Sequence, residues 1–374
     1  MILQIKFRFV GMNMEKIRLE ECCEILDSKR IPITAKDRKS GKYPYYGANG
    51  IQDYVNDYIF DDELVLLAED GGNFGSKERP IAYRVSGKCW VNNHAHVLKA
   101  KEMLDTDYLC YSLMFYDVGG MVNGATRQKL TQSQMRQMLI PKRSLEEQKE
   151  IVKKLDSLAG IKDKRSEQLN LLDNLIKSRF VEMFGDENNP KNWNCVLIDE
   201  VAEVQVGVVI KPAQYYTDRK NGNKAFRSLN VGELKIKDND WVYFNNEGNK
   251  INSRSILKEN DILIVRSGAP GTACVVTKEF EGSNAIDVII ARANENLVNP
   301  YYLAAYTNFP HGKNQIIEGT GGAAQQHFNV GRYKTMKLML PPIELQNEYN
   351  AFINQVDKLK FRLKSLHGRG LRIN

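Results

Sequence analysis

The sequence has few of the features that mark secreted, membrane or small metal-bound proteins. Its six cysteines show neither Cys-x-x-Cys pairs nor a regular framework, which argues against disulfide scaffolds and zinc ribbons and favours a reducing compartment, the cytoplasm. No apolar run approaches the roughly 20 residues that a membrane-spanning helix needs. The opening dozen residues lack a signal-peptide cleavage site, and Met12 and Met14 offer alternative starts. We expect this leader to have little structural consequence.

Complete catalytic motifs are also missing. The glycine-rich segments 71–75 and 319–322 do not continue as phosphate-binding loops, so turns are the simpler interpretation. Segment 299–302, Asn-Pro-Tyr-Tyr, lacks the second proline of the turn with which adenine methyltransferases hold a base, and it reads as a helix start. The pair Glu233 and Lys235 resembles a nuclease motif, but such spacings are common by chance. We therefore expect no catalytic residues in this chain.

A metal site is not expected either. His94 and His96 alternate along a predicted strand, which would place both imidazoles on one face, where they could bind a metal. No carboxylate or cysteine lies nearby in the sequence to complete such a site. The sequence favours polar contacts for both side chains and predicts neither a metal nor a cofactor in this chain.

The length and charge of the chain limit the number of domains and the kinds of partner to be expected. The chain has 374 residues, of which 42% are hydrophobic and 26% charged, and this length predicts two domains. The 53 basic and 46 acidic residues give a net charge of +7. This excess is compatible with a polyanionic partner but does not establish one.

An internal repeat fixes the organisation of the chain. Segment 124–130, Gly-Ala-Thr-Arg-Gln-Lys-Leu, aligns without gaps with segment 322–328, Gly-Ala-Ala-Gln-Gln-His-Phe. Segment 138–148 aligns with 336–346 at the same offset of 198 residues (322 − 124 and 346 − 148). Segments near residues 17 and 196, and near 62 and 261, match in pattern. We predict two diverged copies of roughly 180 residues, each with strands, a short helix, a Gly-Ala loop and a long helix.

Apolar residues recur at alternating spacings of three and four after each copy. The first series runs from Ile151 to Met183 and the second from Tyr349 to Leu366. This spacing is typical of coiled-coil seams. Each helix alone could instead pack on its own domain, but two seams at equivalent places favour mutual packing. A helix from residue 144 to about 184 would be roughly 60 Å long and would serve as a spacer.

Side chains suited to nucleic-acid contact gather in predicted turns. Arg, Asn and Gln read base edges, whereas Lys and backbone amides hold phosphates. Each residue alone is more often an ordinary surface residue. The candidates are Tyr45, Tyr46, Asn49, Asn92, Asn93, His94, Arg127, Gln128 and Lys129 in the first copy, and Arg219, Arg227, Asn230, Arg266, Gln325, Gln326 and His327 in the second. Arg127 and Gln325 hold equivalent places, which favours a positioning contact with the backbone over base reading.

From about Met14, the whole chain resembles the DNA specificity subunit of type I restriction-modification systems. The resemblance depends on motifs that recur in order in both halves. They are 45–51, 90–98 and 140–148 in the first half, and 226–231, 261–271 and 340–346 in the second.

The resemblance implies an α+β fold, with two tandem pseudo-symmetric mixed α/β target recognition domains joined by long antiparallel coiled-coil helices. The implied segments are a first recognition domain at 14–143, a central spacer helix at 144–186, a second recognition domain at 187–341, a C-terminal spacer helix at 342–366 and a basic tail at 367–374.

The family also implies a function. Such subunits are not enzymes, and each recognition domain reads one half of a bipartite site on double-stranded DNA. The implied partners are two modification (methyltransferase) subunits and two restriction (endonuclease and translocase) subunits, which hold S-adenosylmethionine, ATP and magnesium. Two other interpretations remain open: an orphan or silent donor of recognition domains, or a stand-alone DNA-modifying enzyme.

Two departures from the family pattern concern the helices. Arg143 and Ser144 stand where the family usually has two prolines, and the second seam is shorter than the first. The tail carries no seam, and a truncated or frameshifted end is one interpretation. The short second helix leads us to expect that Leu169, Leu172 and Ile176 lack a partner within the chain.

Overall fold

The computed structural model describes residues 15–124, 127–318 and 328–369, and side chains up to residue 365. The predicted leader therefore lies outside the described residues. The chain divides into two compact units, Met1–Asp163 and Lys164–Asn374, which are described separately below. Among the described residues, no helix is both long and apolar enough to cross a membrane.

The first unit is built on a mixed six-stranded sheet with the strand order β2-β7-β5-β6-β3-β4. All neighbours are antiparallel except β3 and β6, which are parallel. The sheet strands are β2 (Cys23–Ile25), β3 (Ser40–Gly47), β4 (Gly50–Val55), β5 (Phe60–Ala68), β6 (Ala82–Val91) and β7 (Ala95–Ala100). The other elements are β1 (Lys16–Arg18), α1 (Leu19–Cys22), a 3₁₀ turn η1 (Asp27–Lys29), α2 (Thr106–Met114), β8 (Val122–Asn123), β9 (Lys129–Leu130), α3 (Gln132–Arg136) and β10 (Leu139–Pro141).

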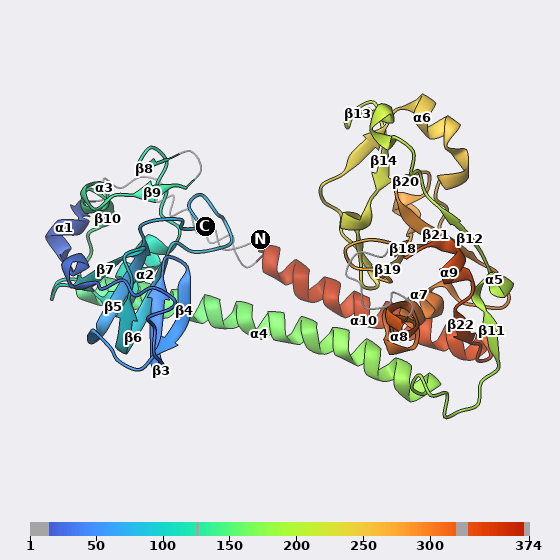
Figure 1. Ribbon diagram of the computed structural model, residues 1–374, viewed down its shortest axis with the longest axis horizontal. Helices are drawn as coiled ribbons and strands as arrows, with labels where there is room; N and C mark the ends of the chain where they lie inside the picture. The colour runs from blue at the N-terminus through green and yellow to red at the C-terminus, as the bar shows by residue number, and fades with distance from the viewer. Residues whose placement is uncertain (1–14, 125–126, 319–327, 370–374) are drawn as a thin grey trace. The chain divides into compact units, whose positions relative to one another are not determined.

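Strand β5 runs through the core of this unit. Val65 and Leu67 pack on one face of the sheet, where α2 covers them, and Leu64 and Leu66 pack on the other (Figure 1). A strand buried on both faces reads as a continuous apolar run rather than an alternating one, which explains the sequence Leu-Val-Leu-Leu here.

The second unit repeats part of this plan. Its four-stranded sheet has the order β12-β21-β18-β19, which corresponds to β2-β7-β5-β6. The pairing of β1 with β10 recurs as β11 with β22. The repeated elements are β11 (Cys195–Leu197), α5 (Ile198–Val201), β12 (Ala202–Val206), β18 (Ile262–Val265), β19 (Ala273–Val275), β21 (Val288–Ala293), α7 (Pro300–Asn308), α9 (Val330–Lys334) and β22 (Lys337–Met339).

The two units differ in what they add to this plan. The first unit extends its sheet through β3 and β4, whereas the second carries a separate sheet with the order β13-β17-β14-β20. The added elements are β13 (Tyr216–Thr217), β14 (Asn223–Phe226), β15 (Val231–Gly232), β16 (Lys235–Ile236), β17 (Val242–Phe244), α6 (Asn246–Ile251), β20 (Asn284–Ala285) and α8 (Pro310–Glu318), together with the 3₁₀ turns η2 (Pro212–Tyr215), η3 (Ser228–Asn230), η4 (Ser253–Ser255) and η5 (Lys278–Phe280).

A long helix follows each copy, α4 (Leu145–Phe184, 40 residues) and α10 (Ile343–Arg369). Within the second unit the end of α4 packs antiparallel on α10. Tyr349 donates its hydroxyl hydrogen to the carbonyl of Ile176 at 3.2 Å, and Lys360 lies 2.6 Å from Asp173. Ile176 is thus buried and Leu172 packs against the same core, which corrects the expectation that these two residues lack a partner within the chain. Helix α10 extends through Arg369, into the segment predicted as a tail.

An equivalent glutamine fastens each long helix to the domain that precedes it. Gln148 accepts a hydrogen bond from the N–H of Asp105 and donates to the carbonyls of Met103 and Arg143, at 2.7, 3.0 and 2.9 Å. Gln346 repeats the pattern with the N–H of Asn299 and the carbonyls of Leu297 and Pro341, at 2.8, 3.3 and 2.8 Å. Both glutamines are buried. We call this arrangement the glutamine clasp.

Candidate nucleic-acid interface

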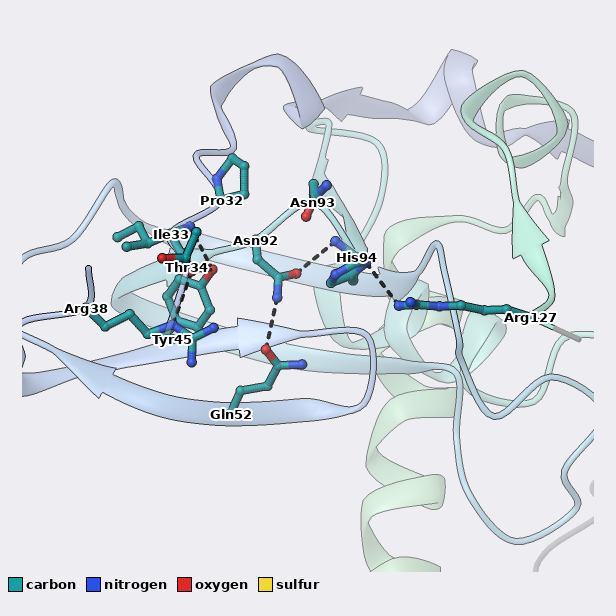
Figure 2. A pocket seen from close by; sticks show the side chains of 10 residues that line it. All are labelled: Pro32, Ile33, Thr34, Arg38, Tyr45, Gln52, Asn92, Asn93, His94 and Arg127. Atoms are coloured by element: carbon teal, nitrogen blue, oxygen red, sulfur yellow. Dashed lines mark hydrogen bonds between the residues drawn. The ribbon is translucent and has the colours of Figure 1, made fainter. Parts of the chain in front are cut away.

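A polar hollow of about 390 Å³ opens on the first unit beside the start of β7 (Figure 2). It brings together five of the residues predicted for nucleic-acid contact. The lining residues are Pro32, Ile33, Thr34, Arg38, Tyr45, Gln52, Asn92, Asn93, His94 and Arg127. The prominence of amide and guanidinium groups makes this hollow suited to hydrogen-bonding ligands rather than apolar ones.

Two of these five residues form the wall rather than the exposed surface. Tyr45 is buried, and its hydroxyl bonds to the main-chain N–H and carbonyl of Ile33 at 3.1 and 3.2 Å. Asn92 is also buried; it donates to Gln52 at 3.0 Å and accepts from the N–H of His94 at 2.8 Å. Their polar groups are satisfied inside the domain, and their contact with nucleic acid stays a prediction. They hold the hollow in shape.

Arg127 and His94 meet at Asp70. Arg127 Nε lies 2.7 Å from Asp70 Oδ1, and His94 Nδ1 lies 3.4 Å from Asp70 Oδ2. The Arg127 guanidinium rests against Gly71, where an added Cβ would lie 3.2 Å from Nε. Gly71 has a φ of +68°, a conformation that favours glycine, and a side chain there would also push on the Arg127 guanidinium.

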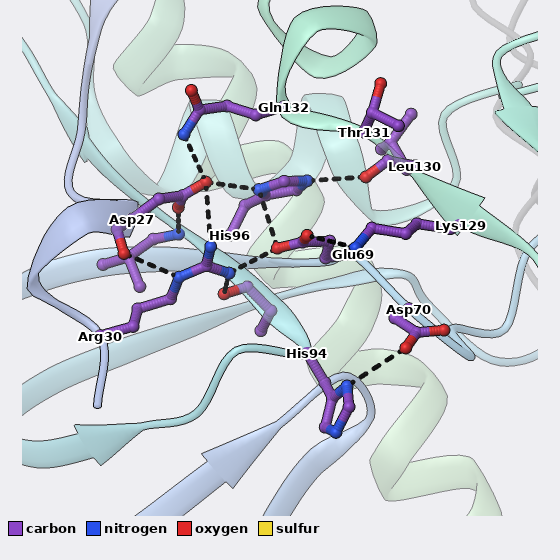
Figure 3. A network of polar contacts seen from close by, with 12 residues as sticks. Asp27, Arg30, Glu69, Asp70, His94, His96, Lys129, Leu130, Thr131 and Gln132 are labelled. Atoms are coloured by element: carbon purple, nitrogen blue, oxygen red, sulfur yellow. Dashed lines mark hydrogen bonds and ion pairs between the residues drawn. The ribbon is translucent and has the colours of Figure 1, made fainter. Parts of the chain in front are cut away.

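Beneath this surface, His96 stands in a buried polar cluster (Figure 3). Its Nδ1 lies 2.7 Å from Asp27 Oδ2, and its Nε2 lies 2.9 Å from the carbonyl of Leu130. Because a carbonyl only accepts, Nε2 carries a hydrogen. These contacts join η1 to β7 and to the segment that follows the Gly124 loop.

Asp27 is the centre of charge in this cluster. Burial would raise the pKa of its carboxyl, but hydrogen bonds from His96, Gln132 and the Val97 N–H outweigh burial, so the pKa lies below its ordinary value. Arg30 lies 3.5 Å from Asp27. The carboxylate is therefore ionised at neutral pH, and these hydrogen bonds hold it in place.

Glu69 links this cluster to the surface. Its carboxylate lies 2.5 Å from Arg30 and 3.1 Å from Lys129. Asp27, Glu69 and His96 offer ligand atoms within 4.8 Å of one another, a spacing that a metal ion could use. The cations of Arg30 and Lys129 already neutralise Glu69, so ion pairs account for its contacts in the cluster.

The arrangement of His94 and His96 differs from the one considered from the sequence. Strand β7 begins at Ala95, so His94 precedes it. His94 turns toward Asp70, whereas His96 is buried beside Asp27. The two imidazoles therefore do not form a shared metal-binding pair.

The remaining predicted residues of the first unit surround the hollow or the Gly124 loop. Asn49 is exposed and donates to the carbonyl of Gly71 at 3.1 Å. Tyr46 packs on Tyr83, with the ring centroids 5.7 Å apart. Asn93, Gln128 and Lys129 are exposed. Their contact with nucleic acid stays a prediction.

In the second unit, Arg266 holds the place that Glu69 holds in the first. Each directly follows the corresponding strand, and its carbonyl accepts a hydrogen bond from the residue after the Gly-Ala loop: Leu130 N–H to Glu69 at 2.8 Å, and Phe328 N–H to Arg266 at 3.1 Å. Arg266 pairs with Asp287 at 2.5 Å. Asp287 precedes β21 as His94 precedes β7.

The other predictions in the second unit have mixed outcomes. Asn230 is buried at the end of η3, where it accepts from the Arg227 N–H and donates to the carbonyl of Asn239, and its contact with nucleic acid stays a prediction. Arg219 is exposed, and Arg227 donates to the carbonyl of Asp240. Gln325, Gln326 and His327 lie outside the described residues.

Sequence reasoning missed the carboxylates that organise the first unit. Asp27, Glu69 and Asp70 come from separate segments and meet only through the fold. The carboxylates after β5 offered a weak signal, because charges directly after a buried strand lie at a sheet edge. Nothing local marked Asp27.

Comparison with known proteins gives a consistent picture. The family model for the type I restriction modification DNA specificity domain matches residues 12–171 and 190–367. A putative type I restriction enzyme specificity subunit of Haemophilus influenzae is 30% identical over 359 residues, covering 93% of this chain and 89% of that protein. The MjaVIII specificity subunit of Methanocaldococcus jannaschii is 24% identical, covering 68% of this chain and 64% of that protein.

Solved structures agree on the fold. The type I restriction-modification S subunit of M. genitalium superposes with a TM-score of 0.55 at 13% identity, covering 95% of this chain and 93% of that one. A chain from a structural study of complex assembly and conformational transition of the type I system gives a TM-score of 0.56 at 16% identity, covering 96% and 95%.

Proposed function

The chain belongs to the family of type I restriction-modification DNA specificity subunits, with two recognition domains, and we propose that each domain reads one half of a bipartite DNA target. The observation that carries this proposal is the repeated frame with different loop chemistry. Both units share the sheet order and the glutamine clasp, yet Glu69 and Arg266 give opposite charges at equivalent places. Two similar frames that carry opposite charges at equivalent places suit two different half-sites.

The linkage of the two domains supplies affinity. When one domain is bound, the other is held near the DNA at high effective concentration, so two modest half-site contacts combine into a tight one. Phosphate contacts supply much of the affinity, and base contacts supply sequence. Helix α4, about 60 Å long at 1.5 Å per residue, is the element that sets the unread gap.

The partners in this proposal are double-stranded DNA, two modification subunits and two restriction subunits. Exposed apolar side chains on the long helices support docking, since such side chains favour burial against another protein. They include Ile161, Leu171 and Leu175 on α4, and Leu359 and Phe361 on α10. In this assembly S-adenosylmethionine, ATP and magnesium belong to the partner subunits, and the complex acts in the cytoplasm.

The proposed role is recognition without catalysis. The purified chain alone, given S-adenosylmethionine and DNA, is expected to transfer no methyl groups. Reproducible transfer that is lost on mutating Asn299 would contradict this role and favour a stand-alone enzyme. Failure to copurify with a modification subunit would favour a silent donor of recognition domains; no structural observation favours either alternative.

A domain exchange tests the modular function directly. Residues 188–340 are replaced by the second recognition domain of another family member, and the methylome of the strain is sequenced. One half-site is expected to change while the other stays intact. If both halves change together, the modular proposal is wrong.

A further inference from the structure

The guanidinium of Arg127 is bound to the domain along one edge, and its other edge has fewer contacts. Its Nε is engaged by Asp70 at 2.7 Å, and its guanidinium lies against the main chain of Gly71. Nη2 has a long contact of 3.5 Å with His94 Nδ1, and Nη1 has no partner among the described residues. The side chain is 59% exposed. Nη1 and Nη2 are therefore the donors of this planar guanidinium that remain for a ligand in the hollow, which Arg127 helps to line (Figure 2).

Asp70 is itself fixed in place. Its N–H donates to the carbonyl of His94 at 3.3 Å, it pairs as an isolated bridge with Lys129, and its side chain is only 21% exposed. Gly71 is anchored by the carbonyl of Gln128, at 3.0 Å, and by Asn49. The carboxylate is thus part of the rigid frame, and Arg127 is oriented by it rather than the reverse.

The charge of this pair argues against a phosphate ligand. A phosphate on Arg127 would lie close to the Asp70 carboxylate, and two like charges repel. The pair as a whole is nearly neutral, so it offers directed hydrogen bonds rather than net positive charge. Arg38, the other arginine of the hollow, is likewise paired, at 3.3 Å from Asp53.

A base edge fits these donors better. Guanine presents two acceptors, O6 and N7, in one plane in the major groove, which matches the arginine fork. Adenine presents a donor and an acceptor there, so one N–H would face another N–H. The sequence alignment of Arg127 with Gln325 suggested a backbone contact, but it carried no information about Asp70.

We propose that Asp70 orients Arg127 to read a guanine in the first half-site, so that this pair determines specificity. The inference rests on the DNA-binding function proposed above. In it, Arg127 touches the base and Asp70 is a positioning residue. Asp70 also discourages non-specific phosphate binding at this place.

The test uses the full chain assembled with its modification subunits and DNA duplexes in which each base pair of the first half-site is varied. Arg127→Ala is expected to weaken binding of the parent target by roughly 5- to 150-fold, to abolish discrimination at one G·C pair and to leave the salt dependence nearly unchanged. Arg127→Lys keeps the charge but loses the fork, so it should lose the same discrimination.

Asp70→Asn separates positioning from simple structure. Freed from its partner, Arg127 should bind all sequences more tightly with a steeper salt dependence, while discrimination at the same G·C pair falls. Arg79→Ala, which removes another exposed arginine of the same unit, is the control for charge and should leave discrimination intact. Thermal unfolding of each variant confirms that the domain stays folded.

Two results would overturn the inference. One is an equal loss for all sequences in Arg127→Ala, with the salt slope lower by about one, which identifies a phosphate contact. The other is a first half-site built from A·T pairs alone. If the unmodified assembly shows no sequence preference at all, the proposed function fails instead, and the two failures are thus distinguishable.

Discussion

The two recognition domains place charge at the same point of the same frame but with opposite sign. After the central strand of the sheet stands Glu69 in the first unit and Arg266 in the second. Their ionic partners are reversed as well: Lys129 and Arg30 surround Glu69, whereas Asp287 pairs with Arg266. The frame thus decides where a charged side chain goes, and the sequence at that point decides what it can contact.

What the two domains share is made mostly of main-chain groups. The glutamine clasp and the pairing of the first and last short strands recur in both. Tyr108 and Tyr302 also donate to equivalent carbonyls, of Pro141 and Met339, at 3.0 and 2.8 Å. If this comparison is right, disrupting the shared frame should lower the free energy of unfolding by the same amount in both units. Removing the charges should affect the two units differently.

The largest expected effect comes from the clasp. Gln346→Leu removes the hydrogen-bond partner of three main-chain groups and should destabilise the second unit by about 4 kcal/mol, and Gln148→Leu should do the same to the first. Urea unfolding followed by tryptophan fluorescence resolves the units, because Trp90 lies in the first unit and Trp193 and Trp241 in the second. Glu348→Leu, on the exposed side of the same helix, is the control. Clearly unequal losses of unfolding free energy in the two variants would contradict the equivalence of the two clasps.

A smaller effect is expected from the buried cluster of Asp27, Glu69 and His96 in the first unit. Asp27→Asn should destabilise that unit by about 2–3 kcal/mol, because it removes the charge that faces His96 and Arg30. The pKa of Asp27 is lowered in the fold, so its contribution is present above the unfolded value of 3.8 and is lost as the pH falls further. The unfolding free energies of the two proteins should therefore converge in acid. A difference that persists unchanged however far the pH falls below 3.8 would contradict the assigned role.

As the pH falls, the second unit should begin to lose stability at a higher pH than the first unit. His311 is buried beside Phe180, and its Nε2 lies 3.0 Å from the carbonyl of Gly185, while Nδ1 meets no partner among the described residues. Burial lowers the pKa of His311, although the carbonyl of Gly185 and the carboxylates of Glu187 and Asp186 act in the other direction.

A lowered pKa means that the unfolded chain takes up the proton first. The stabilisation by neutral His311 is complete above about pH 6.5 and falls below it, by at most about 1.4 kcal/mol per pH unit. His311→Gln keeps a donor for Gly185 and should flatten this dependence. His94→Gln, in the first unit, is the control and should leave the second unit's profile as it was. An equally steep profile in His311→Gln would assign the acid response to other groups.

The smallest expected effect concerns Arg266. Asp287→Asn removes its partner without disturbing the backbone, since Asp287 has a φ of 49° and asparagine tolerates that conformation well. DNA binding should become tighter for all sequences, with a salt slope steeper by at most about one. Glu344→Gln on α10 changes the net charge equally and should leave the slope unchanged. No change in slope for Asp287→Asn would place Arg266 away from the DNA.

The periodic and repeated features of this fold could be predicted from the sequence. The repeat indicated two similar units, and the apolar spacing indicated a helix from about 144 to 184, close to the observed Leu145–Phe184. Such features follow from local order along the chain. The added sheet of the second unit could not be predicted, because β13, β14 and β20 are short and pair with strands that are distant in the sequence.

The site was harder to predict, for a physical reason. Some of the polar residues that were predicted to contact DNA are buried. Tyr45, Asn92 and Asn230 form hydrogen bonds with main-chain groups that a folded turn leaves unpaired. A one-dimensional pattern cannot separate an asparagine that holds a turn from one that faces a ligand. The partner of Arg127 was equally hidden, since Asp70 lies 57 residues away (127 − 70) and meets it only across the sheet edge.

The glutamine clasp has a consequence for how such a protein can change over time. All the groups that Gln148 and Gln346 contact belong to the main chain, and every residue carries a carbonyl while every residue except proline carries an N–H. The side chains at the contacted positions can therefore vary without loosening the clasp. A lineage could acquire new target preferences by substitution or recombination while the clasp is inherited unchanged, because its hydrogen bonds do not depend on side-chain identity at those positions.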